Sequence, residues 1–393
     1  MNAPRIIVVG AGASGLACAI SAAELGASVT VFEAGTRPGR SIMASGNGRC
    51  NFSNADLSPE RYNDPVFVGA SYQGDVASEV LGFFKGLGLW HVCDEEGRYF
   101  PRSRCAASVL DVLLNRIDEL GVRLWIESRV TGLEHVGGEW RVTIEDGQSF
   151  TADRVVWCAG GQSARDLAEL AGLQLVRQGR VLCPIATLPK PAKDLDGARF
   201  NCALSVERAG QVLFSAPGEI LMRKYGLSGI VVFDASRYAA PRDSLVVDLV
   251  PDMSAEELGR DLEARIQAAE RSSDVGFSRL HLLDGAIQPK VALHIMERQC
   301  GRDGMRPVEA GRLAALLKRW QFEVDVLMEG DQAQVTRGGI ANSQVDPLSF
   351  AVEGLPGLYV CGEALDVDGM CGGLNLAWAW HSGILAGRAS GVE

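Results

Sequence analysis

The feature that most constrains the fold is a glycine-rich turn at residues 10–15, with the sequence Gly-Ala-Gly-Ala-Ser-Gly. The run before it, at 5–9, is rich in branched apolar residues and predicts a buried strand. Residues 14–25 are rich in alanine and predict a helix that ends at Gly26. With a second strand predicted at 28–32, the order is typical of a βαβ unit that binds a dinucleotide.

Each glycine of this turn has a separate physical task. Gly10 permits the tight turn, Gly12 lets a pyrophosphate approach the backbone, and Gly15 lets the helix pack closely on the strand. The free N–H groups and positive dipole end of the helix favour phosphate. Glu33 lies eighteen residues after Gly15, where an acid binds ribose hydroxyls. The alternative is a structural turn followed by an exposed glutamate.

Two further loops carry residues suited to a planar cofactor. Arg40 and the segment 45–51, Ser-Gly-Asn-Gly-Arg-Cys-Asn, suit a loop that hydrogen-bonds a polar ring. Arg40 or Arg49 would offset negative charge on a pyrophosphate or a reduced flavin. The predicted strand at 155–158 leads into small residues at 159–161, which permit close approach of the backbone to a cofactor. The alternatives are a surface loop of turn-forming residues and a plain strand exit.

The C-terminal segment repeats the order of strand, glycine loop and helix. A strand is predicted at 358–361, glycines recur between 362 and 373, and a helix is predicted at 376–388. Its start offers a second helix N-terminus to an electron-rich group such as the pyrimidine edge of a flavin. Asp368 or Glu363 is expected to hold a ribityl hydroxyl, because the acids of this loop lack the spacing of a calcium loop.

The middle of the chain has a different texture from its two ends. Up to about residue 188 the alternation of elements suits a doubly wound α/β domain. Short strand-like pieces follow, among them 229–233 and 245–249, and helical patterns then extend to about residue 320. The N-terminal βαβ unit needs more sheet than it contains, and the C-terminal segment supplies it. We therefore predict one domain interrupted by another.

Four motifs together resemble one known family, the BaiN/RdsA-like NAD(P)/FAD-dependent oxidoreductases. They are Gly-Asn-Gly-Arg-Cys-Asn at 46–51, Lys-Tyr-Gly-Leu-Ser-Gly at 224–229, Thr-Arg-Gly-Gly-Ile at 336–340 and the glycine-rich segment 362–376. The resemblance runs from the N-terminus to the last helix. It implies an α/β fold with a split Rossmann-type FAD-binding domain at 1–188 and 336–393, a β-barrel-like inserted domain at 189–252 and 320–335, and a helical insert at 253–319.

FAD is the cofactor that the turn, Glu33 and the resemblance predict. The residues expected to contact it are Gly10, Gly12, Ala13, Ser14, Gly15, Glu33, Ala34, Arg40, Ser45, Gly46, Gly48, Arg49, Cys50, Asn51, Val130, Ala159, Gly160, Gly161, Gly362, Glu363, Asp368, Gly372, Gly373, Asn375, Leu376 and Ala377. An inert cysteine beside the flavin is favoured over a reactive one at positions 50 and 371.

Substrate chemistry is expected from the insert. Tyr225 is the predicted proton donor or orienting group, Lys224 is second, and Arg49 is the third candidate, near the flavin. Lys224 stands where the family has a histidine and Ile230 where it has a proline. Met-Cys at 370–371 replaces an aromatic residue and threonine. The alternative for Tyr225 is a packed position in the barrel core.

The predicted function is an FAD-dependent oxidoreductase that moves hydride between a pyridine nucleotide and a small organic or steroid-like enone. The family resembled includes a reductase of steroid enones and an aminoacetone oxidase, so an amine or alcohol oxidase that uses O₂ stays open. A non-catalytic redox-sensing flavoprotein also stays open. There is no second strand, Gly-x-Gly-x-x-Gly and helix unit, so NAD(P)H is expected as a transient co-substrate.

Composition narrows the partners. The chain carries 38 basic and 49 acidic residues, a net charge of −11, and no basic patch, so nucleic acid is not expected. No apolar run approaches the roughly 20 residues that span a bilayer, so a membrane is not expected either. The ten scattered cysteines and the lack of an export signal predict reduced thiols in the cytoplasm. Cysteine and histidine spacings predict no metal site, and the oligomeric state stays open.

Overall fold

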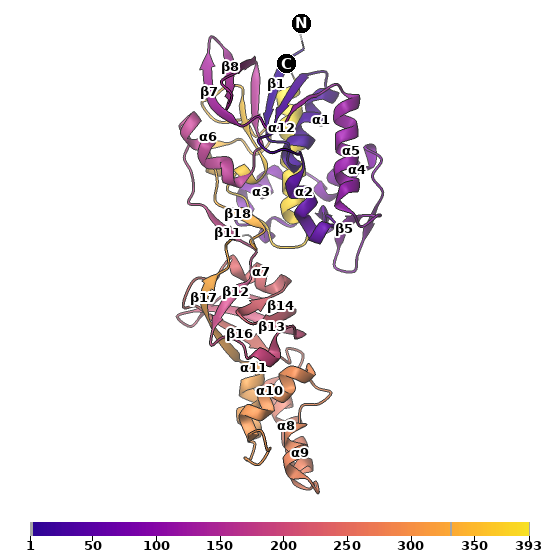
Figure 1. The fold of residues 1–393 in the computed structure, drawn as a ribbon, viewed down its shortest axis with the longest axis vertical. Coiled ribbons are helices and arrows are strands. Elements are labelled where there is room, and N and C mark those ends of the chain that lie inside the picture. The colour runs from indigo at the N-terminus through magenta and orange to yellow at the C-terminus, as the bar shows by residue number, and fades with distance from the viewer. Residues whose placement is uncertain (1–2, 331, 393) are drawn as a thin grey trace. The chain divides into compact units, whose positions relative to one another are not determined.

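The computed structural model describes residues 3–330 and 332–392, which form two compact units (Figure 1). The first unit contains the chain up to Gly179 and from Val335 onward, and the second runs from Arg180 to Gln334. Strands β11 (Gly179–Val181) and β18 (Val335–Arg337) lie where the chain crosses between the units. The predicted α/β fold with an interrupted Rossmann-type domain is therefore confirmed.

A parallel five-stranded sheet forms the centre of the first unit, in the order β19-β10-β1-β2-β6. Its strands are β1 (Arg5–Val9), β2 (Ser28–Phe32), β6 (Arg123–Trp125), β10 (Arg154–Trp157) and β19 (Leu358–Val360). The strand β19 comes from the C-terminal segment and pairs with β10, as the interrupted domain requires. Because all the strands are parallel, the loops that follow their carboxyl ends meet at one edge of the sheet.

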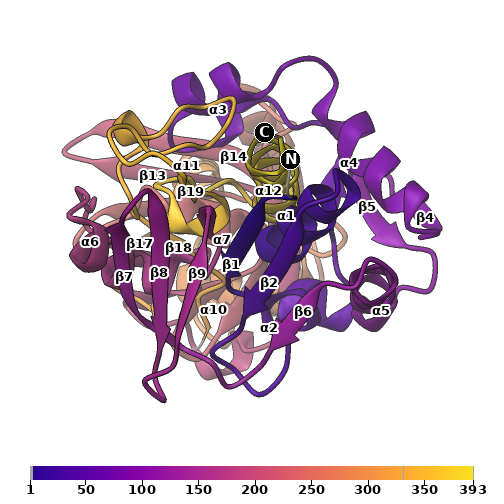
Figure 2. The same cartoon turned by 90° about the horizontal axis from the view of Figure 1, so that it is seen from above.

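Two helices, α1 (Ala13–Glu24) and α12 (Leu374–Gly391), pack side by side (Figure 2). A Cβ atom at Gly383 would collide with the carbonyl oxygen of Ser14, and one at Gly387 with that of Cys18. Glycines four residues apart lie on one face of a helix, so they let the two backbones touch. Both sets of contacts advance in the same direction along the chain, so α1 and α12 run parallel.

Smaller elements surround this centre. An antiparallel sheet contains β3 (Ser53–Asn54), β5 (Arg98–Pro101) and β4 (His91–Cys93), and another contains β7 (Val130–Val136), β8 (Glu139–Ile144) and β9 (Ser149–Ala152). The other helices of the unit are α2 (Arg40–Ala44), α3 (Pro65–Ser71), α4 (Val76–Gly86), α5 (Ala106–Glu119) and α6 (Ala164–Ala171).

The second unit holds a closed six-stranded barrel in the order β12-β15-β14-β13-β16-β17. Its strands are β12 (Ile185–Leu188), β13 (Arg199–Arg208), β14 (Gln211–Arg223), β15 (Gly226–Ser228), β16 (Ser244–Asp248) and β17 (Trp320–Leu327). The inner face is apolar because buried Cys202, Leu204 and Val206 alternate along β13. The strand β12 belongs to the barrel, so the first crossing lies at 179/180 and not at the expected 188/189.

The described residues of the same unit contain five α-helices: α7 (Ile230–Ser236), α8 (Ala255–Glu270), α9 (Val275–Leu280), α10 (Pro289–Cys300) and α11 (Ala310–Lys318). The prediction of a strand at 229–233 was wrong, because these residues form the start of the helix α7. A short apolar run does not distinguish a buried strand from one buried helical turn. Gly229, with φ +111°, turns the chain into the helix, and the Phe233 N–H then donates to the Gly229 carbonyl at 3.0 Å.

The glycine face of α12 leads to a stability prediction. Gly387→Ala places a methyl group against the backbone of α1, which cannot rotate away as a flexible side chain could. We therefore expect a loss of about 2 kcal/mol in the free energy of unfolding. Gly82→Ala is the matched control, because this glycine lies in α4 with open space around it; we expect it to stabilise by about 0.5–1 kcal/mol. Urea unfolding of both variants measures the difference, and equal effects would contradict the proposed close packing.

Candidate cofactor-binding site

Gly10 and Gly15 hold the glycine-rich turn tightly against the sheet. Gly10 follows β1 with φ +100°, and a Cβ atom on it would lie 2.6 Å from the Ala159 Cα atom. A Cβ atom on Gly15 would collide with the Gly10 carbonyl oxygen. The Gly10 N–H donates to the Phe32 carbonyl at 2.7 Å, which ties the turn to the end of β2. These two glycines are therefore required by the packing of the turn itself.

Gly12 differs from its two neighbours in the motif. Its φ of −82° suits any residue, and the nearest heavy atom to a Cβ placed on it is the Ser41 Oγ at 3.7 Å. Gly12 is also the N-cap of α1, and no side chain caps this helix. The first-turn N–H groups thus have no side-chain acceptor, and the space beside Gly12 suits a pyrophosphate.

Glu33 ties the turn to the loop that follows β2. Its Oε2 accepts from the Ala11 N–H at 2.8 Å, and its Oε1 accepts from the Gly35 N–H at 2.7 Å. Each oxygen keeps a further lone pair with which to accept from a ribose hydroxyl. The Ser128 N–H donates to the Glu33 carbonyl at 2.8 Å, so the segment that leads to Val130 runs beside this position. The bond to Ala11 was not foreseen from the sequence.

The loop before β3 carries the predicted arginine and cysteine. Within 45–50, four residues including Cys50 adopt positive φ angles, so the backbone is tightly coiled. Arg40 and Arg49 are exposed, and neither makes an ion pair with another described residue. Cys50 is fully buried, and burial raises the pKa of its thiol to about 11. A neutral buried thiol is a poor nucleophile, which supports the inert interpretation of Cys50.

The C-terminal loop lies against this segment. A Cβ atom on Gly373 would lie 2.5 Å from the Ser53 carbonyl oxygen and 2.7 Å from the Asn51 Oδ1. The Asn375 side chain closes the loop, because it accepts from the Gly369 N–H at 2.8 Å and donates to the Gly369 carbonyl at 2.9 Å. Two predicted motifs, 45–51 and 362–377, therefore meet at one place.

Two buried polar atoms at this meeting point have no hydrogen-bond partner among the described residues, the Asn51 Oδ1 and the Ser53 Oγ. Buried polar groups are nearly always paired, so such atoms fit a ligand that brings its own donors and acceptors. The edge of a flavin ring is such a group. The N-cap of α12 is Gly373, again without a side-chain cap, so a second helix N-terminus opens beside these atoms.

The remaining predicted contacts are placed as follows. Gly160 caps a short helix that begins at Gly161, and Gly161 packs against Thr336. Asp368 is fully buried. Glu363 accepts the Thr336 N–H on its Oε1 at 2.8 Å, so one of its oxygens serves the main chain. That Asp368 or Glu363 holds a ribityl hydroxyl stays a prediction.

Tyr225 and Lys224 lie in the second unit, at the turn between β14 and β15. Tyr225 is half-buried and Lys224 is exposed, so neither belongs to the barrel core. The Tyr225 carbonyl accepts from the Thr187 N–H at 3.0 Å, and the Lys224 N–H donates to the Asp196 Oδ1 at 3.2 Å. Both side chains are thus available for chemistry, and their action on a substrate stays a prediction.

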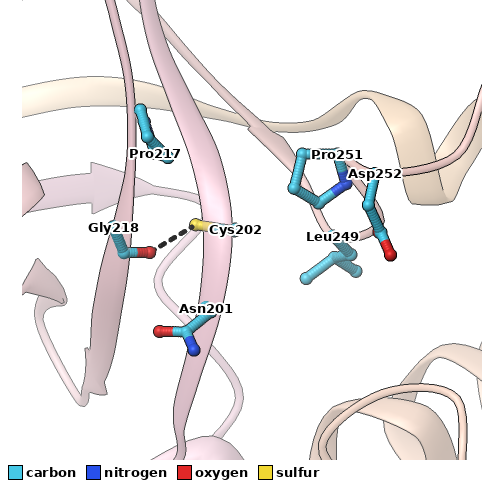
Figure 3. Close-up of a pocket in the computed structure, with 7 residues that line it drawn as sticks. All are labelled: Asn201, Cys202, Pro217, Gly218, Leu249, Pro251 and Asp252. Atoms are coloured by element: carbon cyan, nitrogen blue, oxygen red, sulfur yellow. Dashed lines mark hydrogen bonds between the residues drawn. The ribbon is translucent and has the colours of Figure 1, made fainter.

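A separate cavity of about 510 Å³ lies in the second unit (Figure 3). It is lined by Asn201, Cys202, Pro217, Gly218, Leu249, Pro251 and Asp252. The Cys202 thiol donates to the Gly218 carbonyl at 3.7 Å. Burial raises the pKa of this thiol to about 12. The sequence analysis did not anticipate this cavity, and none of the predicted catalytic residues lines it. Its mostly apolar walls carry no assigned chemistry.

A parallel sheet with a glycine turn, an acid after β2 and a second helix N-terminus defines a dinucleotide-binding flavoprotein. The chain matches the family described as HI0933-like protein Rossmann domain over residues 4–389, and it belongs to that family. FAD is therefore its cofactor, and it is an FAD-dependent oxidoreductase by family. The resemblance drawn from the four motifs is confirmed.

Two curated relatives span nearly the whole chain. One, "3-dehydro-bile acid delta(4,6)-reductase" of Clostridium scindens, is 32% identical over 98% of this chain and 98% of its own. Another, "Ribosomal RNA dihydrouridine synthase" of Haemophilus influenzae, is 28% identical over 96% of both. Because one of these relatives is named for a reaction on ribosomal RNA, nucleic acid is not excluded as a partner, contrary to our expectation. That expectation used the net charge of the chain, which does not describe the charge of a local contact surface.

Among solved structures, the fold is similar to that of 3-ketosteroid delta1-dehydrogenase from Sterolibacterium denitrificans. The TM-score is 0.50, with 16% identity and complete coverage of both chains. At this identity the likeness concerns the fold alone. Within residues 3–330 and 332–392, no helix is long and apolar enough to cross a membrane, and no cluster of three potential metal ligands is present.

Gly12→Ala separates cofactor binding from folding. The new methyl group makes only an ordinary contact in the protein, with the Ser41 Oγ at 3.7 Å, but occupies the expected place of the pyrophosphate, so we expect the Kd for FAD to rise at least about tenfold, or about 1.4 kcal/mol. The melting temperature of the FAD-free protein should not change. Gly15→Ala is the control and should lower that melting temperature, because its methyl group strikes the Gly10 carbonyl. Unchanged FAD affinity in Gly12→Ala would remove Gly12 from the site.

Proposed function

We propose that this protein is an FAD-dependent reductase of a carbon–carbon double bond conjugated to a carbonyl, with NAD(P)H as the hydride donor. The observation that carries the proposal is similarity over nearly the full chain to two curated relatives whose names describe one kind of reaction. A Δ4 bond beside a 3-oxo group and the 5,6 bond of uracil are both conjugated to a carbonyl. Saturation of either adds a hydride to the β carbon and a proton to the α carbon.

FAD, once reduced by NAD(P)H, would supply the hydride in such a reaction. The residues of this chain then have three tasks: to hold the ring, to polarise the carbonyl and to deliver the proton. The 45–51 and 362–377 loops serve the first task. Tyr225, a half-buried residue on a turn, is the proposed proton donor or carbonyl partner, and Lys224 is second. Arg49 is exposed and forms no ion pair with another described residue, so it is proposed to offset charge on the reduced ring.

A small steroid-like enone is the proposed substrate, and a uridine in ribosomal RNA is the second candidate. The bile acid reductase is the more similar of these two relatives, at 32% against 28% identity. The chain has a net charge of −11, and its helical segment 253–319 has 11 basic and 10 acidic residues. A protein that holds RNA through phosphate contacts needs a concentrated positive surface. The RNA candidate is retained because the chain matches that relative over 96% of its length.

The deciding experiment is anaerobic mixing of the purified protein with NADH or NADPH, monitored by bleaching of the flavin absorbance. We expect rapid bleaching, followed by reoxidation on addition of a 3-oxo-4-ene steroid. Reoxidation by unmodified ribosomal RNA and not by the steroid would select the second candidate. Reduction by an amine or alcohol with transfer of electrons to O₂ would indicate an oxidase. No reduction by any donor would overturn the proposal and favour a redox-sensing flavoprotein.

The role of Tyr225 is tested by Tyr225→Phe, which removes only the hydroxyl. We expect turnover of the enone to fall by about 10²-fold or more, the lower range for general acid catalysis. FAD content, melting temperature and the rate of flavin reduction by NAD(P)H should stay close to wild type. The matched control is Tyr238→Phe, because Tyr238 lies in the same unit and stacks on Phe214 at 5.2 Å. Equal turnover in the two variants would exclude Tyr225 from the chemistry.

A further inference from the structure

A short segment outside every predicted motif supports the C-terminal glycine loop. Tyr62 forms an isolated antiparallel bridge with Gly369. On either side of it, the Met370 N–H donates to the Arg61 carbonyl at 3.0 Å, and the Asn63 N–H donates to the Asp368 carbonyl at 2.9 Å. The loop that leads into α12 is therefore held by residues 61–63 as if by a second strand.

The side chain of Tyr62 continues this support into the first turn of α12. Tyr62 is buried, and its hydroxyl donates to the Leu374 carbonyl at 3.1 Å. The same hydroxyl lies 2.8 Å from that of Tyr72. A tyrosine has one hydroxyl proton, and the Leu374 carbonyl can only accept, so the Tyr62 proton points to Leu374. Tyr72 must then donate to Tyr62, which fixes the direction of the chain of hydrogen bonds.

The Tyr72 hydroxyl stays neutral in this arrangement. Burial, together with the nearby Tyr62, raises the pKa of Tyr72 well above its usual value. The Tyr62 ring packs directly against Gly369. A Cβ atom at position 369 would lie 2.9 Å from this ring, so the contact requires a glycine there. Tyr72 therefore acts as a fixed neutral donor to Tyr62, and Tyr62 as the donor to Leu374.

A buried histidine fixes the outer end of the pair. The His381 ring meets the Tyr72 ring edge to face, with centroids 4.9 Å apart. Its Nδ1 lies 2.8 Å from the Glu79 Oε2, and its Nε2 lies 3.2 Å from the Ser71 Oγ. Burial acts to raise the pKa of the Glu79 carboxyl, but its bonds with His381 and Arg388 outweigh this and leave that pKa below its usual value. Glu79 is thus the ionised acceptor for the imidazole.

We propose that Tyr62, supported by Tyr72, is a positioning residue for the flavin: it fixes the first turn of α12, and so the N–H groups that face the pyrimidine edge of the ring. The inference rests on the assignment of the 362–377 loop to FAD. A helix N-terminus stabilises negative charge, which is greater on the reduced ring than on the oxidised one. Tyr62 therefore favours the reduced flavin, although it does not touch the substrate.

The test is Tyr62→Phe, which keeps the ring against Gly369 and removes only the bond to the Leu374 carbonyl. We expect the two-electron midpoint potential of the bound flavin to become more negative, because the reduced form loses affinity more than the oxidised form. A tenfold difference in that loss corresponds to about 30 mV. The visible spectrum of the oxidised flavin should also shift. Tyr72→Phe should move the potential in the same direction by less, because Tyr62 keeps its own bond.

Ser71→Ala is the matched control. Ser71 is fully buried and lies beside His381 in the same cluster, but none of the hydrogen bonds described above joins it to Tyr62 or Leu374. The substitution should therefore lower the melting temperature and leave the midpoint potential of the flavin unchanged. A wild-type potential and spectrum in Tyr62→Phe, with FAD saturating, would overturn the proposal, and so would an equal shift in Ser71→Ala. If Tyr62→Phe does not fold, a wild-type potential in Tyr72→Phe overturns it.

These measurements need neither hydride donor nor enone, so they are independent of the proposed reaction. A wild-type protein that purifies without FAD, and does not bind it when added, would instead refute the cofactor assignment itself.

Discussion

The packing of α12 on α1 is the interaction on which the rest of the first unit depends. Gly383 and Gly387 let the two parallel helices touch through their backbones. Gly383 lies against Ser14, the second residue of α1. The helix α12 begins nine residues before Gly383, whereas α1 begins one residue before Ser14, so the N-terminus of α12 extends roughly 12 Å beyond that of α1 at 1.5 Å per residue. One helix start is therefore the one predicted to hold the pyrophosphate, and the other lies farther along in the same direction, as the predicted flavin contacts require.

The two helix starts share a chemical feature with those of α2 and α7, a glycine N-cap without a side-chain hydrogen bond. Gly12 and Gly373 are both N-caps without side chains, whereas the helix α8 begins with Ser254 and Glu257 bonded reciprocally in a capping box. A side-chain cap satisfies N–H groups within the protein, and a glycine leaves them to a ligand. The first unit thus keeps two helix starts uncapped by side chains at the edge of the sheet where its loops meet, a form of pre-organisation for an electron-rich cofactor.

The supports of these loops come from distant parts of the chain. Glu33 holds the first turn through Ala11, and Asn375 and Tyr62 hold the last loop through Gly369 and Leu374. The second unit has its own closed barrel and core, so the proposed substrate residues belong to a separately packed part of the chain.

The sequence alone determined the parts whose chemistry is local: the turn at 10–15, Glu33 after the second strand, and the glycine loop before α12. Their signals are short because a tight turn and a helix start involve consecutive residues. Only the tertiary structure decided that Glu33 also bonds Ala11, that Asn51 lies beside Gly373, that Tyr62 supports Leu374, and that 230–236 is a helix. The first three features depend on contacts between segments up to about 320 residues apart, which local sequence patterns do not specify. The last depends on burial, because a short apolar run is compatible with either a helix or a strand.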